Sequence, residues 1–113
     1  MKAKLSCAFL CAALLCAACS SSRRSEPIEG AFKPSSGSVQ RGQQVFLGFC
    51  SKCHPGGEGG LGPSLNDKPL PVFLMKLQVR KGLGAMPSFS EKQIPDQQLD
   101  DLMAFIVAYR HHG

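Results

Sequence analysis

The sequence predicts an all-α domain, and two observations lead to this fold class. Three segments carry apolar residues at helical spacing, over about residues 38–49, 71–82 and 95–110. No stretch alternates apolar and polar side chains in the way that a half-buried strand does. The chain has 113 residues and no internal repeat, so it is long enough for one domain at most. We expect the folded domain to span residues 38–113.

The first predicted helix runs from Ser38 to about Phe49. The hydroxyl of Ser38 is suited to accept a hydrogen bond from a free N–H group of the first turn. Val39, Gly42 and Phe46 recur at helical spacing and share one face with Phe49.

The second predicted helix begins with Pro71 in its first turn, where the fixed φ of proline fits a helix. Leu74 and Leu77 are among its apolar positions, and Gly82 is a typical C-terminal stop. A loop rich in Gly and Pro, residues 54–66, separates it from the first helix.

The third predicted helix begins at Pro95 or Asp96 and ends at Arg110. Acidic residues near its start and Arg110 near its end match the helix dipole. Its apolar stripe consists of Leu99, Leu102, Met103, Ile106 and Tyr109.

The N-terminus has the pattern of an exported protein. A short basic start precedes an apolar run over residues 5–18. This run is too short to cross a bilayer, which takes about 20 residues. We therefore expect residues 1–18 to be a signal peptide. The alternative is a buried N-terminal helix, but the run has no amphipathic pattern.

The signal peptide ends in small residues followed by Cys19, which resembles a bacterial lipoprotein signal. Such signals usually have Leu three residues before the lipidated cysteine, and this chain has Cys16 there. We expect Cys19 to carry the lipid, and residues 19–37, rich in Ser, Gly, Pro and charge, to form a flexible linker. The predicted location is periplasmic and membrane-anchored, at the inner or the outer membrane. Cleavage without lipidation would instead give a soluble periplasmic protein.

Six cysteines in a small exported protein usually indicate three disulfides, but the positions contradict that interpretation here. Cys19 is the predicted lipid site, and Cys50 and Cys53 remain for the folded domain. The other three lie in the predicted signal peptide: Cys7, Cys11 and Cys16.

The charge of the mature chain is modest. Removal of residues 1–18 takes two lysines from the 13 basic residues, which leaves 11 against 8 acidic residues, or +3. This charge argues against a strongly basic nucleic-acid binder, and we expect no nucleic-acid partner.

The decisive motif is Cys50-Ser51-Lys52-Cys53-His54, a C-x-x-C-H attachment site for c-type haem. Two thiols three positions apart can each bond one vinyl group of the porphyrin. The next residue, His54, can then reach the iron. Export agrees with this interpretation, because c-type haem is attached outside the cytoplasm.

C-x-x-C pairs also occur in redox disulfides and in zinc sites. A redox disulfide pair usually lies near a βαβ pattern, and none occurs in this sequence. A zinc site needs four ligands, but no second cysteine pair follows, so His111 or His112 would have to supply the fourth.

Around this motif the sequence resembles the small class I cytochromes c, over about residues 38–113. The shared features follow the order of that family: Gly42 and Phe46 before Cys50, the haem motif itself, Gly60-Leu61-Gly62-Pro63-Ser64-Leu65, Gly84-Ala85-Met86-Pro87-Ser88-Phe89, and Leu102-Met103-Ala104-Phe105-Ile106. The resemblance implies the cytochrome c fold, in which three to four short helices wrap around one covalently attached haem.

The resemblance also implies residue roles. His54 would be the proximal ligand of the iron and Met86 the distal one, and the Pro63 carbonyl would accept a hydrogen bond from the second ring nitrogen of His54. Gly42 would let the first helix cross the last one closely, with the Phe46 ring packed at the crossing against Phe105.

The context of Met86 agrees with the ligand role. Met75 and Met103 fall within predicted helices, where methionine usually fills the core. His111 and His112 lie at the C-terminus, where solvated side chains are expected. Met86 lies in an irregular loop.

With both axial positions filled, no site remains for a substrate, so the chain is expected to be an electron carrier and not an enzyme. It would pass single electrons between a redox donor and a redox acceptor through weak, transient contacts. Five lysines could ring the exposed edge of the haem and steer an acidic partner, although each one alone is also explained by solvation of the surface: Lys52, Lys68, Lys76, Lys81 and Lys92. A gas sensor or enzyme with a displaced Met86, and a fixed subunit of a larger oxidoreductase, are the alternatives.

Overall fold

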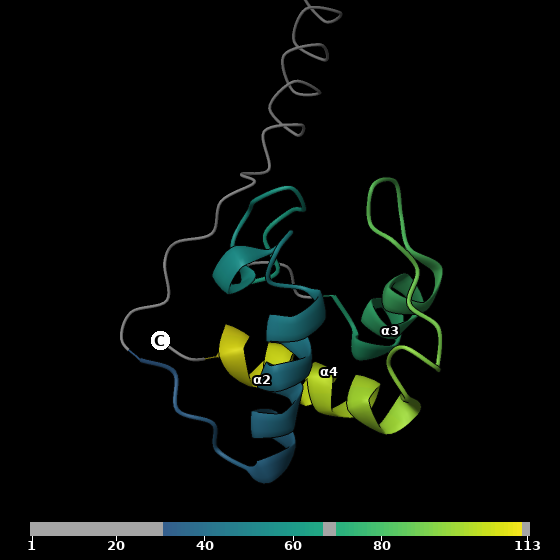
Figure 1. Ribbon diagram of the computed structural model, residues 1–113. Coiled ribbons are helices and arrows are strands. Elements are labelled where there is room, and N and C mark those ends of the chain that lie inside the picture. Colours follow the sequence, from purple (N-terminus) through teal and green to yellow (C-terminus); the bar gives the residue numbers. More distant parts are fainter. Residues whose placement is uncertain (1–30, 67–69, 112–113) are drawn as a thin grey trace, which may run out of the picture.

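The computed structural model describes residues 31–66 and 70–111, and the predicted signal peptide, Cys19 and most of the predicted linker lie outside them. The chain order is α2 (Gly37–Phe49), the short 3-10 helix η1 (Pro55–Gly57), α3 (Val72–Lys81) and α4 (Asp96–Arg110) (Figure 1). Within these ranges there is no strand, only an isolated bridge between Leu83 and Met86. The all-α prediction is confirmed.

The helix ends differ slightly from the predicted ones. The prediction that Ser38 caps the first helix is wrong: Ser36 occupies the capping position, and its hydroxyl accepts from the N–H of Val39 at 3.3 Å. The physical reason is the backbone, which is extended at Ser36 and already helical at Ser38. Pro71 stands one position before the first residue of α3 and not in its first turn.

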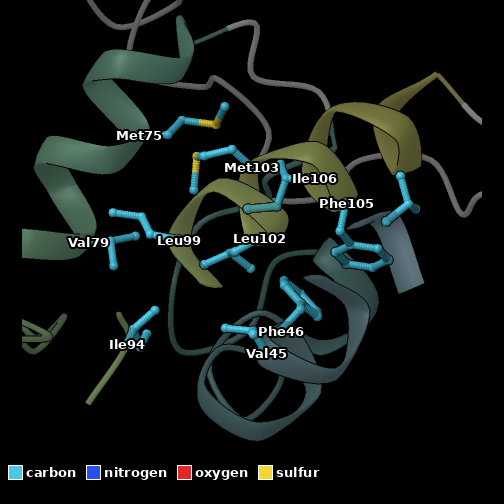
Figure 2. Packing of buried hydrophobic residues seen from close by; sticks show 11 residues of the cluster. Val45, Phe46, Met75, Val79, Ile94, Leu99, Leu102, Met103, Phe105 and Ile106 are labelled. Atoms are coloured by element: carbon cyan, nitrogen blue, oxygen red, sulfur yellow. The ribbon is translucent and has the colours of Figure 1, made fainter. Parts of the chain in front are cut away.

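The core forms where α2, α3 and α4 meet (Figure 2). Val45 and Phe46 of α2 face Leu102 of α4, while Met75 and Val79 of α3 approach α4 from its other side. The predicted stripe of α4 is buried from Leu99 to Ile106, and Tyr109 is partly buried.

The crossing of α2 and α4 is very close. A Cβ atom built on Gly42 would lie only 1.9 Å from the carbonyl oxygen of Asp101. The rings of Phe46 and Phe105 pack beside this point, with centroids 5.2 Å apart. Glycine is required because the backbone of α4 occupies the space that any side chain would need.

A partly buried ion pair lies at the same crossing. Arg41 Nε donates to Asp101 Oδ2 at 2.7 Å and Arg41 Nη2 donates to Oδ1 at 3.1 Å. The Asp101 side chain is 3% exposed, whereas that of Arg41 is 62% exposed. The hydrogen bonds from Arg41 lower the pKa of Asp101 below its ordinary value, although burial acts in the opposite direction.

The end of the predicted linker contacts the domain. The ring of Phe32 packs edge-on against Phe105 at 5.5 Å and against Tyr109 at 5.2 Å. In the described part of the chain, no helix is both long enough and apolar enough to cross a membrane.

Candidate haem site

The C-x-x-C-H motif follows directly from the end of α2. The N–H of Cys50 donates to Phe46 O at 2.8 Å and ends the helix. The N–H groups of Cys53 and His54 both donate to Cys50 O, at 3.1 and 2.9 Å. These bonds coil the chain into a tight turn, and its three functional side chains line one cavity.

The His54 ring is held from two sides. Its Nδ1 lies 2.8 Å from Pro63 O, and a carbonyl oxygen can only accept, so Nδ1 carries the hydrogen. This tautomer leaves the lone pair of Nε2 for a metal ion. On the other side, a Cβ atom on Gly62 would lie 2.2 Å from His54 Cε1, so only glycine lets the loop pass the ring.

The loop after the motif is tied back onto the turn. Gly62 N donates to Cys53 O at 2.9 Å and Leu65 N donates to Gly57 O at 2.7 Å. Ser64, which is fully buried, donates its hydroxyl hydrogen to Gly57 O at 3.3 Å. The Pro63 carbonyl is therefore positioned by backbone hydrogen bonds on either side of it.

Met86 lies in the loop between α3 and α4. Its N–H and C=O pair with the backbone of Leu83, at 3.0 and 3.2 Å. The loop is attached to α3 where Phe89 N donates to Val79 O at 2.9 Å. The Phe89 ring also meets Phe49 at the end of α2, with centroids 5.7 Å apart. Met86 is thus held at a fixed place relative to the Cys50–His54 turn.

A cavity of about 490 Å³ lies between the turn and the Met86 loop, within the usual range for cofactor sites. Cys50, Cys53, His54 and Met86 all line it. The rest of the lining is mostly apolar and comes from all three α-helices and both loops.

These residues fit a covalently bound haem. The two cysteines form no disulfide, so both thiols are free for thioether bonds. The lining offers a large apolar group a mostly apolar surface, and one wall carries an imidazole with an available nitrogen. Leu61 and Leu83 line the cavity and are 88% and 71% exposed.

The two alternative interpretations of the motif find no support in the structure. Burial, and to a smaller degree the neighbouring Cys53 thiol, raises the pKa of the Cys50 thiol to about 11. Such a thiol is protonated at neutral pH, unlike the reactive thiolate of a redox pair. Among the described residues, no three His, Cys, Asp or Glu side chains come together to hold a metal ion such as zinc.

The helical fold, the C-x-x-C-H turn and the apolar cavity between His54 and Met86 define a c-type cytochrome domain. The comparisons agree: residues 37–106 match a family described as cytochrome C oxidase, cbb3-type, subunit III. The chain belongs to the small monohaem class I cytochromes c, with one covalently bound haem c and a role in electron transfer.

Three relatives illustrate the similarity. The chain is 32% identical to cytochrome c6 of Bryopsis maxima over 87 residues, which cover 68% of this chain and 98% of that one. It is also 32% identical to cytochrome c6 of Gloeothece citriformis over 85 residues, covering 68% and 76%. The cytochrome c subunit of 4-cresol dehydrogenase from Pseudomonas putida is 32% identical over 65 residues, covering 58% and 57%.

Four of the site residues predicted from the sequence meet at the cavity: Cys50, Cys53, His54 and Met86. The predicted contact between Pro63 O and His54 is present. Cys19 lies outside the described residues. Sequence reasoning missed Arg110 as a cavity residue, because an arginine at a helix end is ordinarily explained by the helix dipole.

Proposed function

We propose that the protein is an electron carrier whose haem iron is held by His54 and Met86. The observation that carries this proposal is the arrangement of one cavity. The His54 imidazole, whose Nδ1 is hydrogen-bonded to Pro63 O, lines this cavity. The thioether of Met86, whose loop is fixed by backbone hydrogen bonds, lines it as well. Met75 and Met103 line the same cavity but are buried in helices at 7% and 3% exposure, where they fill the core.

Bound haem would supply one-electron chemistry between Fe(III) and Fe(II). The Met86 thioether donates weakly and so favours Fe(II), while the hydrogen bond to Pro63 O keeps the His54 imidazole oriented and basic. The mostly apolar lining would shield much of the haem from water. With His54 and Met86 both bound to it, the iron would have no open position for a substrate, which supports a carrier and not an enzyme.

An optical spectrum of the full chain, matured with its haem, tests this ligand set. We expect sharp c-haem bands after reduction, the weak long-wavelength sulfur–iron band after oxidation, and no change on adding carbon monoxide. A spectrum without the sulfur band, or one altered by carbon monoxide, would contradict Met86 ligation and favour a sensor or an enzyme.

Docking to redox partners is proposed to be weak and electrostatically steered. Lys52, Lys81 and Lys92 are exposed and able to meet an acidic partner, whereas Lys76 is already paired with Asp100. Electron-transfer rates with an acidic redox protein should fall as ionic strength rises. Rates that do not depend on salt would remove the steering role of these lysines.

We also propose that Cys19 is lipidated and anchors the protein to a membrane on the periplasmic side, as its signal pattern suggests. Replacing Cys19 with Ser should release the protein from the membrane fraction, while Cys16→Ser should leave it there. Retention of the Cys19→Ser variant in the membrane fraction would exclude Cys19 as the anchor.

A second candidate function is that of a fixed redox subunit in a larger oxidoreductase. It is favoured by the similarity to the cytochrome c subunit of 4-cresol dehydrogenase. It also fits the outer face of α3, where Phe73 is 68% exposed and Leu77 is 52% exposed.

Co-purification from native membranes tests this candidate. A stable complex should be weakened by Leu77→Ser on the outer face of α3. Leu47→Ser on α2 should leave the complex intact, and it is a matched control because the two leucines are almost equally exposed, at 52% and 53%. Recovery of the monomer alone would favour the mobile carrier.

A further inference from the structure

Arg110, the last residue of α4, is the one arginine or lysine among the described residues that line the cavity. Its side chain is partly buried and ties three segments together. Arg110 Nε donates to Leu65 O at 2.8 Å, Nη1 to Leu70 O at 3.4 Å, and Nη2 to Met75 Sδ at 3.2 Å.

These contacts leave the charge of Arg110 uncompensated. Its partners are two carbonyl oxygens and one thioether, and none of them is an anion. A guanidinium has five N–H donors, so two remain after these three bonds. Burial also lowers the pKa of Arg110, which shows that the surroundings disfavour its positive charge.

None of the described residues that line the cavity carries a carboxylate. Arg110 also takes part in none of the ion pairs among the described residues. The haem c of this protein brings two propionate groups, which are negative at neutral pH. An arginine presents paired donors that match a carboxylate, and such charge-assisted bonds are about twice as strong as neutral ones.

We infer that Arg110 binds a haem propionate with its remaining N–H groups and thereby tunes the iron toward Fe(II). Two effects act in the same direction. The positive guanidinium opposes the extra positive charge of Fe(III), and it neutralises a propionate that would otherwise favour Fe(III). Arg110 is a positioning residue for the edge of the haem that carries the propionates. This contact does not require Met86 to be the distal ligand.

The test compares Arg110→Gln and Arg110→Lys in the haem-loaded full chain by spectroelectrochemistry. For Arg110→Gln we expect the equilibrium constant for reduction to fall at least threefold, which is about 28 mV at 59 mV per tenfold change. Arg110→Lys keeps the charge and should stay within about twofold of the wild type. Both variants should lower the thermal midpoint, because both lose bonds to the Leu65 and Leu70 carbonyls.

Arg41→Gln is the matched control, because it removes one positive charge at the crossing of α2 and α4, outside the cavity lining. It should leave the potential unchanged. The propionate-bending bands of the resonance Raman spectrum give a direct readout, and they should shift in both Arg110 variants and not in Arg41→Gln. The oxidised sulfur–iron band shows separately whether Met86 ligation is present.

The inference is overturned if Arg110→Gln keeps the wild-type potential and propionate bands while its thermal midpoint falls. That result would mean that Arg110 only ties the loop and α3 to α4. If Arg110→Gln does not mature, Arg110→Lys decides alone: shifted propionate bands support the contact, and unchanged bands exclude it.

Discussion

Substitution of Gly42 by Ala tests the packing on which the whole domain depends. The added Cβ would lie 1.9 Å from Asp101 O, 2.5 Å from Asp101 C and 2.8 Å from Phe105 Cβ. Two of these atoms belong to the backbone of α4, so a side-chain rotation cannot relieve the clash. The helices have to move apart, and the Phe46–Phe105 contact at 5.2 Å opens with them.

The size of the effect follows from two opposing terms. Overpacking of a well-packed core costs about 1–3 kcal/mol, with the upper part expected where backbone is hit. Alanine gains about 0.8–1.0 kcal/mol over glycine as a helix former. We therefore expect Gly42→Ala to lower the free energy of unfolding by about 1–2 kcal/mol, or the thermal midpoint by about 4–16 °C in a domain of this size.

Gly48→Ala is the matched control, because Gly48 lies in the same helix and a Cβ there would meet nothing within 4 Å. It should raise the free energy of unfolding by up to about 1 kcal/mol. Thermal unfolding of the two haem-loaded variants, followed by far-ultraviolet circular dichroism, measures both changes. If Gly42→Ala is as stable as Gly48→Ala, α2 and α4 do not cross as closely as described.

Three further predictions concern the site and the ion pair. Met86→Ala should remove the sulfur–iron band, let carbon monoxide bind the reduced protein and lower the reduction potential by on the order of 0.1 V, within the ~0.8 V that axial ligands cover. Gly62→Ala places a Cβ 2.2 Å from His54 Cε1, so it should displace the ring, cost about 1–3 kcal/mol of stability and raise the potential as the imidazole becomes less basic. The folded-state pKa of Asp101 is lowered, so the ionised Asp101 carboxylate stabilises the fold above its unfolded-state pKa of about 3.9. This contribution to the free energy of unfolding is lost as the pH falls through the lower folded-state pKa. Denaturant titrations between neutral and strongly acidic pH measure this loss.

Each of these predictions has its own control. Met75→Leu is the control for Met86, and it should keep the sulfur–iron band and carbon monoxide resistance. Gly62→Ala is compared with Gly48→Ala, and an unchanged potential would show that the His54 ring does not depend on Gly62. Asp101→Asn should flatten the acid part of the pH profile, and a slope equal to that of the wild type would mean that other carboxyl groups cause the acid loss.

The local sequence was enough to predict three helices and the haem motif. Gly82 ends α3 as expected, with φ at +70° and its N–H bonded to Gln78 O. The choice between Ser36 and Ser38 as the cap could not be predicted. Both are good capping residues, and only the backbone path before α2 decides between them.

The burial of Asp101 was also beyond sequence reasoning. An acidic residue in the first half of a helix agrees with the helix dipole and is usually solvated. Its environment is set by Arg41, which is 60 residues away in the chain and reaches it only because α2 crosses α4. The cavity position of Arg110 was missed for the same reason, since its partners Leu65 and Leu70 come from another loop.

The sequence by itself determined the covalent chemistry. The spacing of Cys50, Cys53 and His54 is a local property of the chain, and a five-residue motif needs no distant partner to be recognised. Only the tertiary structure decided what surrounds the haem. The tautomer of His54, the close crossing at Gly42 and the uncompensated charge of Arg110 each depend on residues far apart in the sequence, because burial and hydrogen bonding are set by which segments pack together.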